Sequence, residues 1–264
     1  DMYWGLKKIL LTIFADTIEA DFIDLTDMEL IRQHIKKNTV LIWTETPSNP
    51  LLKITDIKAV AQLAKSEGLI LACDSTFASP SLQNPIALGA DIVMHSSTKY
   101  IGGHSDVLGG VLVTAQQNEF WERIRNIQQT GGEVPAPFDC FLLSRSLKTL
   151  AYRMKGHCEN GLALALYLQK HPRVTKVFYP GLPDHPGHSI AKTQMTGFGG
   201  MLSILVKGDA DDARKVVNKV NLFAQATSLG GVESLVEHRA SVEGPDTKTP
   251  QNLIRISAGL EHID

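Results

Sequence analysis

Short apolar runs alternate with helix-like stretches between residues 40 and 114. The runs predict four strands, at residues 40–43, 69–73, 92–94 and 111–113. Between the first two, apolar residues recur at helical spacing over residues 57–64, with Asp56 placed to cap the helix and Gly68 to end it. Strands that are apolar on both faces and separated by helices are typical of a parallel sheet covered on both sides. The pattern therefore predicts an α/β fold for this half of the chain.

The pattern changes in the second half of the chain, after the turn-rich stretch at residues 131–137 and the Pro/Gly/His-rich loop at 180–188. The expected elements are a helix at 120–127, one or two long helices over 141–168, a strand at 201–206, a helix at 209–220 and a strand at 253–257. We therefore predict two domains. The first covers residues 1–140, and the second is a smaller α+β domain over residues 141–264 that includes the linking helix.

Both ends of the sequence look cut. It starts at Asp1 without an initiator methionine, and it stops at Asp264, where an acid-rich helix is just beginning. We expect a portion of a longer chain that lacks the N-terminal part of the first domain and the C-terminal end of the second.

The composition is that of an ordinary globular protein, with 43% hydrophobic and 20% charged residues. The net charge of −2 gives no electrostatic reason to expect nucleic acid or an acidic membrane as a partner. No apolar run approaches the roughly 20 residues needed to span a bilayer. The three cysteines are far apart in the sequence and odd in number, which favours a reducing, cytoplasmic setting.

Polar residues gather where three predicted strands end, at residues 45–49, 74–76 and 96–99. Ligands of parallel sheets bind outside the carboxyl ends of the strands, so these residues mark a candidate site. They include an amine (Lys99), a carboxylate (Asp74) and several hydroxyls. Such groups hold pyridoxal 5'-phosphate (PLP), because a lysine forms a Schiff base with its aldehyde, an acid pairs with its pyridinium nitrogen and hydroxyls bind its phosphate.

The stretch Ser96-Ser97-Thr98-Lys99 supplies the amine and two of these hydroxyls. Alternation along an extended segment would place Ser96 and Thr98 on one side, where both can bind one phosphate. Lys99 would point into the crevice at the sheet end, where desolvation and a cationic ring lower the pKa of its amine. Plainer interpretations stay open, since a lone lysine is most often a surface residue and hydroxyls often cap helices or bond to their own backbone.

Four further residues are candidates for contact with the cofactor. Asp74 is expected to pair with the pyridinium nitrogen and keep the ring protonated, with Thr76 bracing its carboxylate. Asn49 is placed to donate a hydrogen bond to the phenolic oxygen of the ring, and Tyr3 to stack on its face. The alternatives are a helix cap or turn residue for Asp74 and simple packing for Tyr3, which lies near the chain end.

Arg255 lies in the predicted strand at residues 253–257, and Ile254 and Ile256 occupy the opposite face. One role for Arg255 is a planar fork that binds the α-carboxylate of an amino acid, and the other is an ordinary surface or edge arginine. The histidines show no metal-ligand spacing, so no metal site is predicted. The glycine pairs at 102–103 and 230–231 match neither a Walker loop nor a dinucleotide fingerprint.

Nine short motifs connect these residues to a known family. In order, they are Asp1–Tyr3, Glu45–Pro50, Asp74–Phe77, Ser96–Tyr100, Gly102–Asp106, Arg145–Leu150, Tyr179–Leu182, Ser228–Ser234 and Leu253–Ser257. On these motifs the chain resembles the PLP-dependent enzymes of cysteine and methionine metabolism, which include cystathionine γ-lyase, cystathionine γ-synthase, cystathionine β-lyase and methionine γ-lyase. The resemblance implies a type I aminotransferase-like PLP domain on a mostly parallel sheet, a smaller C-terminal domain and a homotetramer built from dimers.

The resemblance also implies roles for individual residues. The implied assignments are Lys99 as Schiff-base lysine and proton shuttle, Asp74 as pyridinium partner, Ser96 and Thr98 as phosphate ligands, Tyr3 as stacking and catalytic group, and Asn49, Arg255 and the backbone around Ser234 as partners of the substrate carboxylate. The run Glu237–Gly244 lacks the Met-Thr-His motif that is common beside the substrate in this family.

The activity within the family depends on weaker signals. Glu233 favours the γ-lyase and γ-synthase branch, because a carboxylate facing the distal end suits a substrate with an ammonium group there, such as cystathionine. A surface glutamate is the plainer alternative. We expect Cγ–S elimination of cystathionine or γ-replacement on an O-acylhomoserine, with cystathionine β-lyase or methionine γ-lyase activity as alternatives. A catalytically silent scaffold of the same fold is the alternative outside enzymes.

Overall fold

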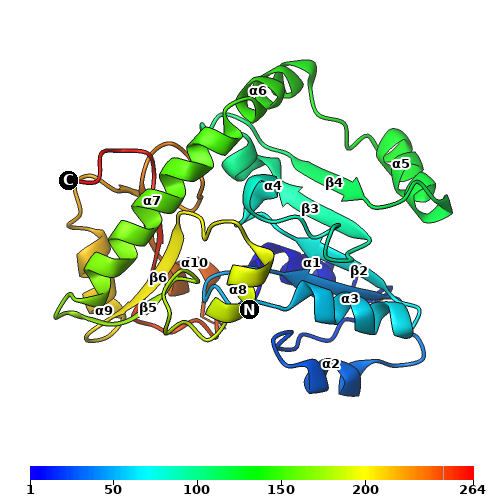
Figure 1. Cartoon of the computed structure of the whole chain (residues 1–264), viewed down its shortest axis with the longest axis horizontal. Helices are drawn as coiled ribbons and strands as arrows, with labels where there is room; N and C mark the ends of the chain where they lie inside the picture. Colours follow the sequence, from blue (N-terminus) through cyan, green and yellow to red (C-terminus); the bar gives the residue numbers. More distant parts are fainter. Residues whose placement is uncertain (246) are drawn as a thin grey trace.

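The computed structural model describes residues 1–245 and 247–264, and a four-stranded sheet carries the polar clusters. The sheet has the order β1-β2-β3-β4, with β1 at Leu41–Glu45, β2 at Ile70–Asp74, β3 at Ile92–Ser96 and β4 at Gly110–Thr114. All four predicted strands are therefore confirmed. The first three run parallel, so that Glu45 pairs with Asp74 and Asp74 with Met94 at their carboxyl ends. The carboxyl ends of β1, β2 and β3, which the polar clusters follow, accordingly lie at the same end of the sheet (Figure 1).

The fourth strand runs against the other three, because β4 pairs with β3 in the antiparallel direction, which agrees with the predicted mostly parallel sheet. A parallel connection requires a crossover, usually a helix that returns across the sheet. Residues 97–109 instead contain the single helical turn η1 (Ser97–Ile101) before the chain turns back. The sheet is therefore mixed, with an antiparallel edge strand.

The sequence predicts two of the helices in this half, at residues 57–64 and 120–127, and the described residues form five. They are α1 (Trp4–Thr12), α2 (Met28–His34), α3 (Ile57–Ser66), α4 (Ser79–Leu82) and α5 (Glu119–Gly131). The Asp56 side chain accepts a hydrogen bond from Ala59 N–H at 2.9 Å and so caps α3. Gly68 follows the helix with a φ of +68°, a left-handed value that glycine adopts without a steric penalty. The buried face of α3 packs with Ile42 and Leu71 of the sheet and Ile31 of α2.

A five-stranded sheet of order β5-β6-β9-β8-β7 forms the second half (Figure 1). Its strands are β5 (Val174–Phe178), β6 (Met201–Val206), β7 (Ala224–Gln225), β8 (Leu235–His238) and β9 (Leu253–Ser257), and its helices are α6 (Pro137–Leu147), α7 (Leu150–Gln169), α8 (His188–Gln194), α9 (Ala210–Val217) and α10 (Arg239–Glu243). The predicted strands at 201–206 and 253–257 are confirmed, and the predicted helix at 209–220 ends three residues early as α9. The predicted domain boundary at residue 140 falls inside α6 and stays a prediction.

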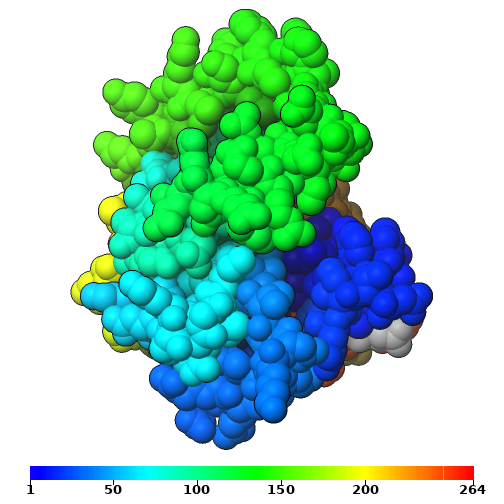
Figure 2. Space-filling view, turned by 90° about the vertical axis from the view of Figure 1, so that its right-hand side faces the viewer, coloured from blue at the N-terminus to red at the C-terminus, as the bar shows by residue number. Residues whose placement is uncertain are grey.

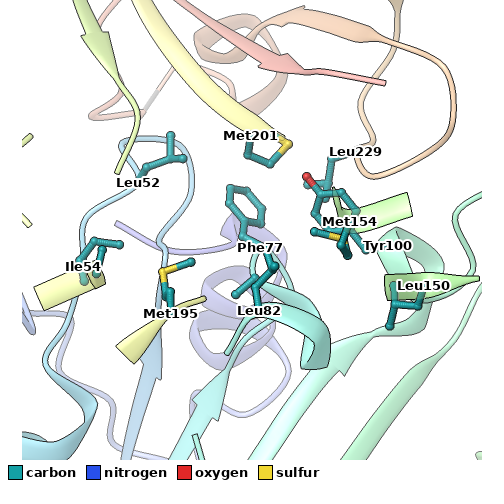
Figure 3. Packing of buried hydrophobic residues seen from close by; sticks show 12 residues of the cluster. Leu52, Ile54, Phe77, Leu82, Tyr100, Leu150, Met154, Met195, Met201 and Leu229 are labelled. Atoms are coloured by element: carbon teal, nitrogen blue, oxygen red, sulfur yellow. The ribbon is translucent and has the colours of Figure 1, made fainter. Parts of the chain in front are cut away.

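One core cluster joins the two sheets. Phe77 and Tyr100, from the first half, are buried together with Met201 and Leu229 from the second. Figure 3 shows Phe77 facing Met201, with Tyr100 beside Leu229. Burying a side chain of this size contributes about 1.5–3 kcal/mol. Because Tyr100 directly follows Lys99, this core anchors the backbone that carries the amine.

The segment of α5 and α6 and the N-terminal segment with α1 lie on one face of the molecule (Figure 2). In the part of the chain that the structure describes, no helix is long and apolar enough to cross a membrane. Within the same residues, no group of three or more His, Cys, Asp or Glu side chains is arranged to hold a metal ion.

Candidate active site

Lys99 lies in the turn that follows β3. Its backbone, with φ −92° and ψ −128°, interrupts η1, and Gly103 N–H donates to its carbonyl oxygen at 2.7 Å. The amine is partly buried and donates a hydrogen bond to Ser228 Oγ at 3.1 Å. Burial lowers the pKa of Lys99, and the positive charge of Arg255 lowers it further. The surroundings therefore favour a neutral, nucleophilic amine more than water does.

Asp74 ends the neighbouring strand β2 and is braced by Thr76. Its Oδ1 accepts hydrogen bonds from the Thr76 N–H at 2.9 Å and the Thr76 hydroxyl at 2.6 Å. Thr76 Oγ1 in turn accepts a hydrogen bond from Ser96 N–H at 2.9 Å, which ties Asp74 to the end of β3. Burial raises the pKa of Asp74, whereas the two bonds from Thr76 lower it by favouring the carboxylate.

Glu45 lies beside Asp74 in the sheet, at the end of β1. Its Oε2 accepts a hydrogen bond from Tyr3 N–H at 2.7 Å. Burial raises the pKa of Glu45 to about 8, and the negative charge of Asp74 is the second cause. The Tyr3 ring is half-exposed and tilted against Trp4, with ring centroids 6.3 Å apart. Tyr3 is thus joined to the site through its main chain.

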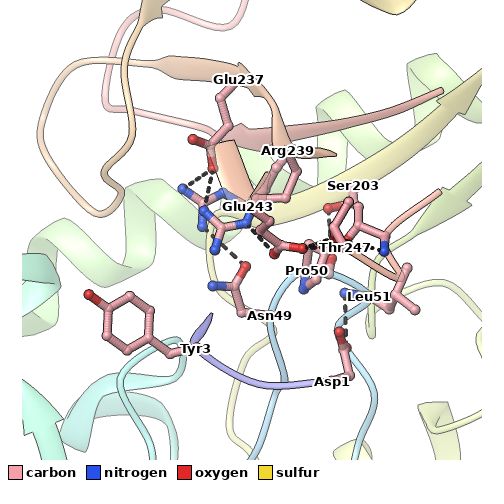
Figure 4. A network of polar contacts seen from close by, with 12 residues as sticks. Asp1, Tyr3, Asn49, Pro50, Leu51, Ser203, Glu237, Arg239, Glu243 and Thr247 are labelled. Atoms are coloured by element: carbon pink, nitrogen blue, oxygen red, sulfur yellow. Dashed lines mark hydrogen bonds and ion pairs between the residues drawn. The ribbon is translucent and has the colours of Figure 1, made fainter. Parts of the chain in front are cut away.

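Asn49 and Arg255, far apart in sequence, meet in the structure. Arg255 Nη1 donates to Asn49 Oδ1 at 3.1 Å, and both side chains are 4% exposed. Because the amide oxygen accepts this bond, the amide nitrogen of Asn49 lies on the side toward Tyr3 (Figure 4). Burial lowers the pKa of Arg255 to about 10, while the carboxylate of Glu237 opposes that shift. Arg255 is therefore a buried cation at neutral pH and not a surface arginine.

Ser228 connects the amine to the guanidinium. Its hydroxyl accepts the bond from Lys99, and its carbonyl oxygen accepts a bond from Arg255 Nη2 at 3.0 Å. Gly230 N–H donates to Ser257 Oγ at 2.9 Å, which holds the Ser228 loop against β9. One residue therefore sets the relative positions of Lys99 and Arg255.

The two hydroxyls predicted for a phosphate are not related by strand alternation. Ser96 is the last residue of β3, whereas Thr98 lies inside the turn η1. Thr98 Oγ1 donates to the Gly109 carbonyl at 3.3 Å and accepts from the Gly109 N–H at 3.0 Å. The alternation argument is wrong because the chain leaves extended geometry at Ser97 to form the turn. The phosphate role of both residues stays a prediction.

Glu233 and Ser234 lie in the loop beyond Ser228. The Glu233 carboxylate accepts a hydrogen bond from the Ser105 hydroxyl, which places it against the turn that follows Lys99. Ser234 donates its N–H at 2.6 Å and its hydroxyl at 2.7 Å to Glu261. In residues 1–245 and 247–264, no hydrogen bond joins Ser234 to Arg255.

A family model described as Cys/Met metabolism PLP-dependent enzyme matches residues 1–264. The chain belongs to this family. Its sequence is 47% identical to cystathionine beta-lyase of Coxiella burnetii and 46% identical to cystathionine gamma-lyase of Dictyostelium discoideum. Each match covers all of this chain and 70% of the relative.

Solved structures show the same fold. The structure of metB from Corynebacterium glutamicum matches with a TM-score of 0.97 at 46% identity. Cystathionine gamma-lyase from Lactobacillus plantarum, complexed with L-serine, matches with a TM-score of 0.94 at 40% identity. All of this chain is covered in both cases, against 70% and 71% of the two solved chains. The PLP-dependent Cys/Met metabolism enzyme therefore has the predicted α/β fold.

The side chains at the sheet edge fit PLP. Among the described residues, the Ser228 hydroxyl is the one hydrogen-bond partner of Lys99 Nζ, and Asp74 Oδ2 has none. An amine of lowered pKa and a carboxylate with a free oxygen are the groups that the aldehyde and the ring nitrogen of PLP require. The fit therefore depends on Lys99 and Asp74 themselves and not on the family match alone.

Sequence reasoning assigned no role to Ser228, Glu45 or Glu237. Ser228 and Glu45 lie inside two of the motifs, but their partners become visible only in three dimensions. Glu237 directly follows the apolar pair Leu235-Val236, and the structure places it in the buried strand β8 with 3% of its surface exposed. A charged residue in a buried strand indicates a partner of opposite charge.

Proposed function

We propose that this enzyme acts at Cγ of a sulfur amino acid, by Cγ–S elimination of cystathionine or by γ-replacement on an O-acylhomoserine. The observation that carries the proposal is the Ser228 bridge, which holds the Lys99 amine and the Arg255 guanidinium at one residue. An amino-acid substrate needs both groups at once, a base near Cα and a cation at its α-carboxylate. Relatives named cystathionine gamma-lyase and cystathionine gamma-synthase support this substrate class.

When bound, PLP supplies an electron-accepting ring that stabilises negative charge at Cα of the amino acid. Lys99 attaches the cofactor and moves the Cα proton, and its burial favours the neutral amine that this task needs. Asp74 holds a proton at the ring nitrogen, and the two hydrogen bonds from Thr76 favour the carboxylate form that this needs. Arg255 and Asn49 bind the α-carboxylate through Nη1 and the amide nitrogen.

The remaining assignments are proposals of the same kind. Ser96 and Thr98 hold the phosphate, and Tyr3 stacks on the ring and assists catalysis. The backbone at Ser234 supports the carboxylate site through its loop. Glu233 faces the distal end of the substrate, and its contact with Ser105, six residues after Lys99, supports this placement.

Elimination at Cβ is the second candidate, because the relative at 47% identity is named cystathionine beta-lyase. Methionine γ-lyase activity is a further alternative within the family. A catalytically silent scaffold is disfavoured by the presence of Lys99, Asp74 and Arg255 together.

Product analysis with the holoenzyme tests the proposal. Cystathionine should yield cysteine and 2-oxobutanoate by γ-cleavage, and O-acylhomoserine with cysteine should yield cystathionine. Homocysteine with pyruvate would show β-cleavage instead. Lys99→Ala should abolish turnover, whereas Lys155→Ala, on the exposed face of α7, should not. Turnover retained by Lys99→Ala would contradict the assigned chemistry.

We also propose a homotetramer built from dimers, with residues 1–140 as the PLP domain and 141–264 as the smaller domain. Large apolar side chains support assembly, since Leu108 is 80% and Phe138 67% exposed. A cytoplasmic location is supported by the three free cysteines. Sedimentation of the holoenzyme should give a mass four times that of one chain.

A further inference from the structure

Four charged side chains are buried together beside Asn49 (Figure 4). They are Glu237 of β8, Arg239 and Glu243 of α10, and Arg255 of β9, with side chains 1–11% exposed. Two are positive and two negative, so the cluster is neutral. Arg255 belongs to the proposed substrate site, whereas the other three have no role in it so far.

A single carboxylate oxygen of Glu237 forms ion pairs with both arginines. Its Oε1 lies 2.5 Å from Arg255 Nη2 and 3.1 Å from Arg239 Nη1. Among the described residues, Glu237 Oε2 and Arg239 Nη2 are buried without a hydrogen-bond partner. One carboxylate is therefore divided between two guanidinium groups.

Arg239 is held on its other side by Glu243. Arg239 Nε donates to Glu243 Oε1 at 2.8 Å, and Glu243 Oε2 accepts hydrogen bonds from the hydroxyls of Thr247 and Thr249. These contacts prevent Arg239 from turning away from Glu237. A buried, fixed charge of this kind acts strongly on its neighbours, because little water screens it.

The donors of Arg255 are partly used by the protein. Nη2 donates a hydrogen bond to the Ser228 carbonyl and forms an ion pair with Glu237, while Nη1 donates a hydrogen bond to Asn49. A ligand carboxylate must use the remaining N–H groups, next to the amide nitrogen of Asn49. It therefore binds close to Glu237, whose negative charge opposes it.

We propose that Arg239 determines how strongly Arg255 binds a substrate carboxylate, because the positive charge of Arg239 partly neutralises Glu237. With a carboxylate bound, the cluster carries one negative charge when Arg239 is present and two when it is absent. Arg239 is thus a specificity-determining residue that acts through Glu237 without touching the substrate. The inference rests on the proposed role of Arg255.

The same charges act on the amine of Lys99. Arg255 and Arg239 lower its pKa, and Glu237 raises it. The field of Arg239 thus extends to the proposed reaction site, beyond the ion pair with Glu243.

Binding of L-alanine and L-alaninamide to the holoenzyme tests the inference, with each dissociation constant measured from the cofactor absorbance. The two ligands differ in the carboxylate, so their ratio reports its recognition and cancels general damage to the site. Arg239→Gln should reduce the preference for alanine about tenfold. In a Glu237→Gln background the same substitution should change it by less than about threefold, because the effect passes through Glu237. Equal losses in both backgrounds would overturn the proposal.

Two further variants separate the possible failures. Arg255→Lys must reduce the preference for alanine, and if it does not, the proposed carboxylate site itself is wrong. A loss in Arg255→Lys without one in Arg239→Gln overturns the inference alone. Arg214→Gln, at an exposed arginine of α9, is the matched control and should leave the ratio unchanged.

Arg239→Gln removes a buried cation, so circular dichroism must first show that it folds. If it does not fold, Glu243→Gln decides from the opposite direction. In Glu243→Gln the amide oxygen can still accept the hydrogen bond from Arg239 Nε and hold the side chain in place. The loss of the Glu243 charge then leaves Arg239 more strongly paired with Glu237, and the preference for alanine should rise. An unchanged or reduced preference would overturn the proposal.

Discussion

Glu45→Gln is expected to stabilise the protein at alkaline pH. Burial beside Asp74 raises the pKa of Glu45 from 4.5 to about 8 in the folded chain. Between these values the native state binds more protons at this group than the unfolded state, so stability falls as the pH rises. Glutamine has no proton to lose, and its amide oxygen can accept the Tyr3 N–H in place of the carboxylate.

The magnitude follows from that shift. At about 1.36 kcal/mol per pKa unit, the ionised Glu45 costs about 5 kcal/mol of unfolding free energy at pH 9 and about 1 kcal/mol at pH 5. The variant should exceed the wild type by these amounts. Groups that do not interact with Glu45 titrate alike in both proteins and cancel in the difference.

Urea unfolding of the apoprotein, followed by circular dichroism at pH 5, 7 and 9, measures the difference. The apoprotein is used because a cofactor at Asp74 would add its own proton linkage. Glu67→Gln, at the exposed end of α3, is the matched control and should leave the stability within about 0.5 kcal/mol at each pH. Parallel pH curves for the wild type and Glu45→Gln would refute the reasoning, because burial would then not oppose ionisation of Glu45.

Three further outcomes are expected. Ser228→Ala removes the acceptor of the Lys99 amine and should lower kcat about tenfold with a smaller change in KM; an unchanged kcat would show that the bond does not position the amine. Thr76→Val removes the hydroxyl that donates to Asp74 Oδ1 and keeps the main-chain donor. The pKa of Asp74 should therefore rise, and the affinity for PLP, measured by fluorescence titration, should fall about tenfold. Leu202→Ala opens a cavity in the core of the second sheet and should lower the free energy of unfolding, measured in urea, by about 2–5 kcal/mol. An unchanged free energy of unfolding would show that neighbouring side chains fill the cavity.

Local signals predicted the elements that depend on neighbouring residues. The Asp56 cap, the apolar face over residues 57–64 and Gly68 located α3, because capping and helical periodicity act within a few residues. The orientation of β4 was not predictable in this way. It depends on whether residues 97–109 cross the sheet or turn back. A short apolar run predicts a strand but does not indicate whether that strand is parallel or antiparallel to its neighbour.

In the candidate site, too, contacts between residues close in sequence were predictable and contacts between distant residues were not. Asp74 and its brace Thr76 are two residues apart, so the sequence could predict their contact. Lys99 and Ser228 are 129 residues apart, and Asn49 and Arg255 are 206 apart. Such contacts depend on how the two sheets pack through their common core, which no local pattern reports.

The sequence by itself determined the chemistry of this protein: an amine, a carboxylate and an arginine in motifs that specify the family and its cofactor. Residue types and short spacings are enough for that, because each group carries its reactivity with it. Only the tertiary structure decided what surrounds them. The Ser228 bridge, the raised pKa of Glu45 and the shared carboxylate of Glu237 arise from burial and from charges brought together across the fold. Packing sets the strength of those electrostatic interactions, since water no longer screens the groups that it encloses.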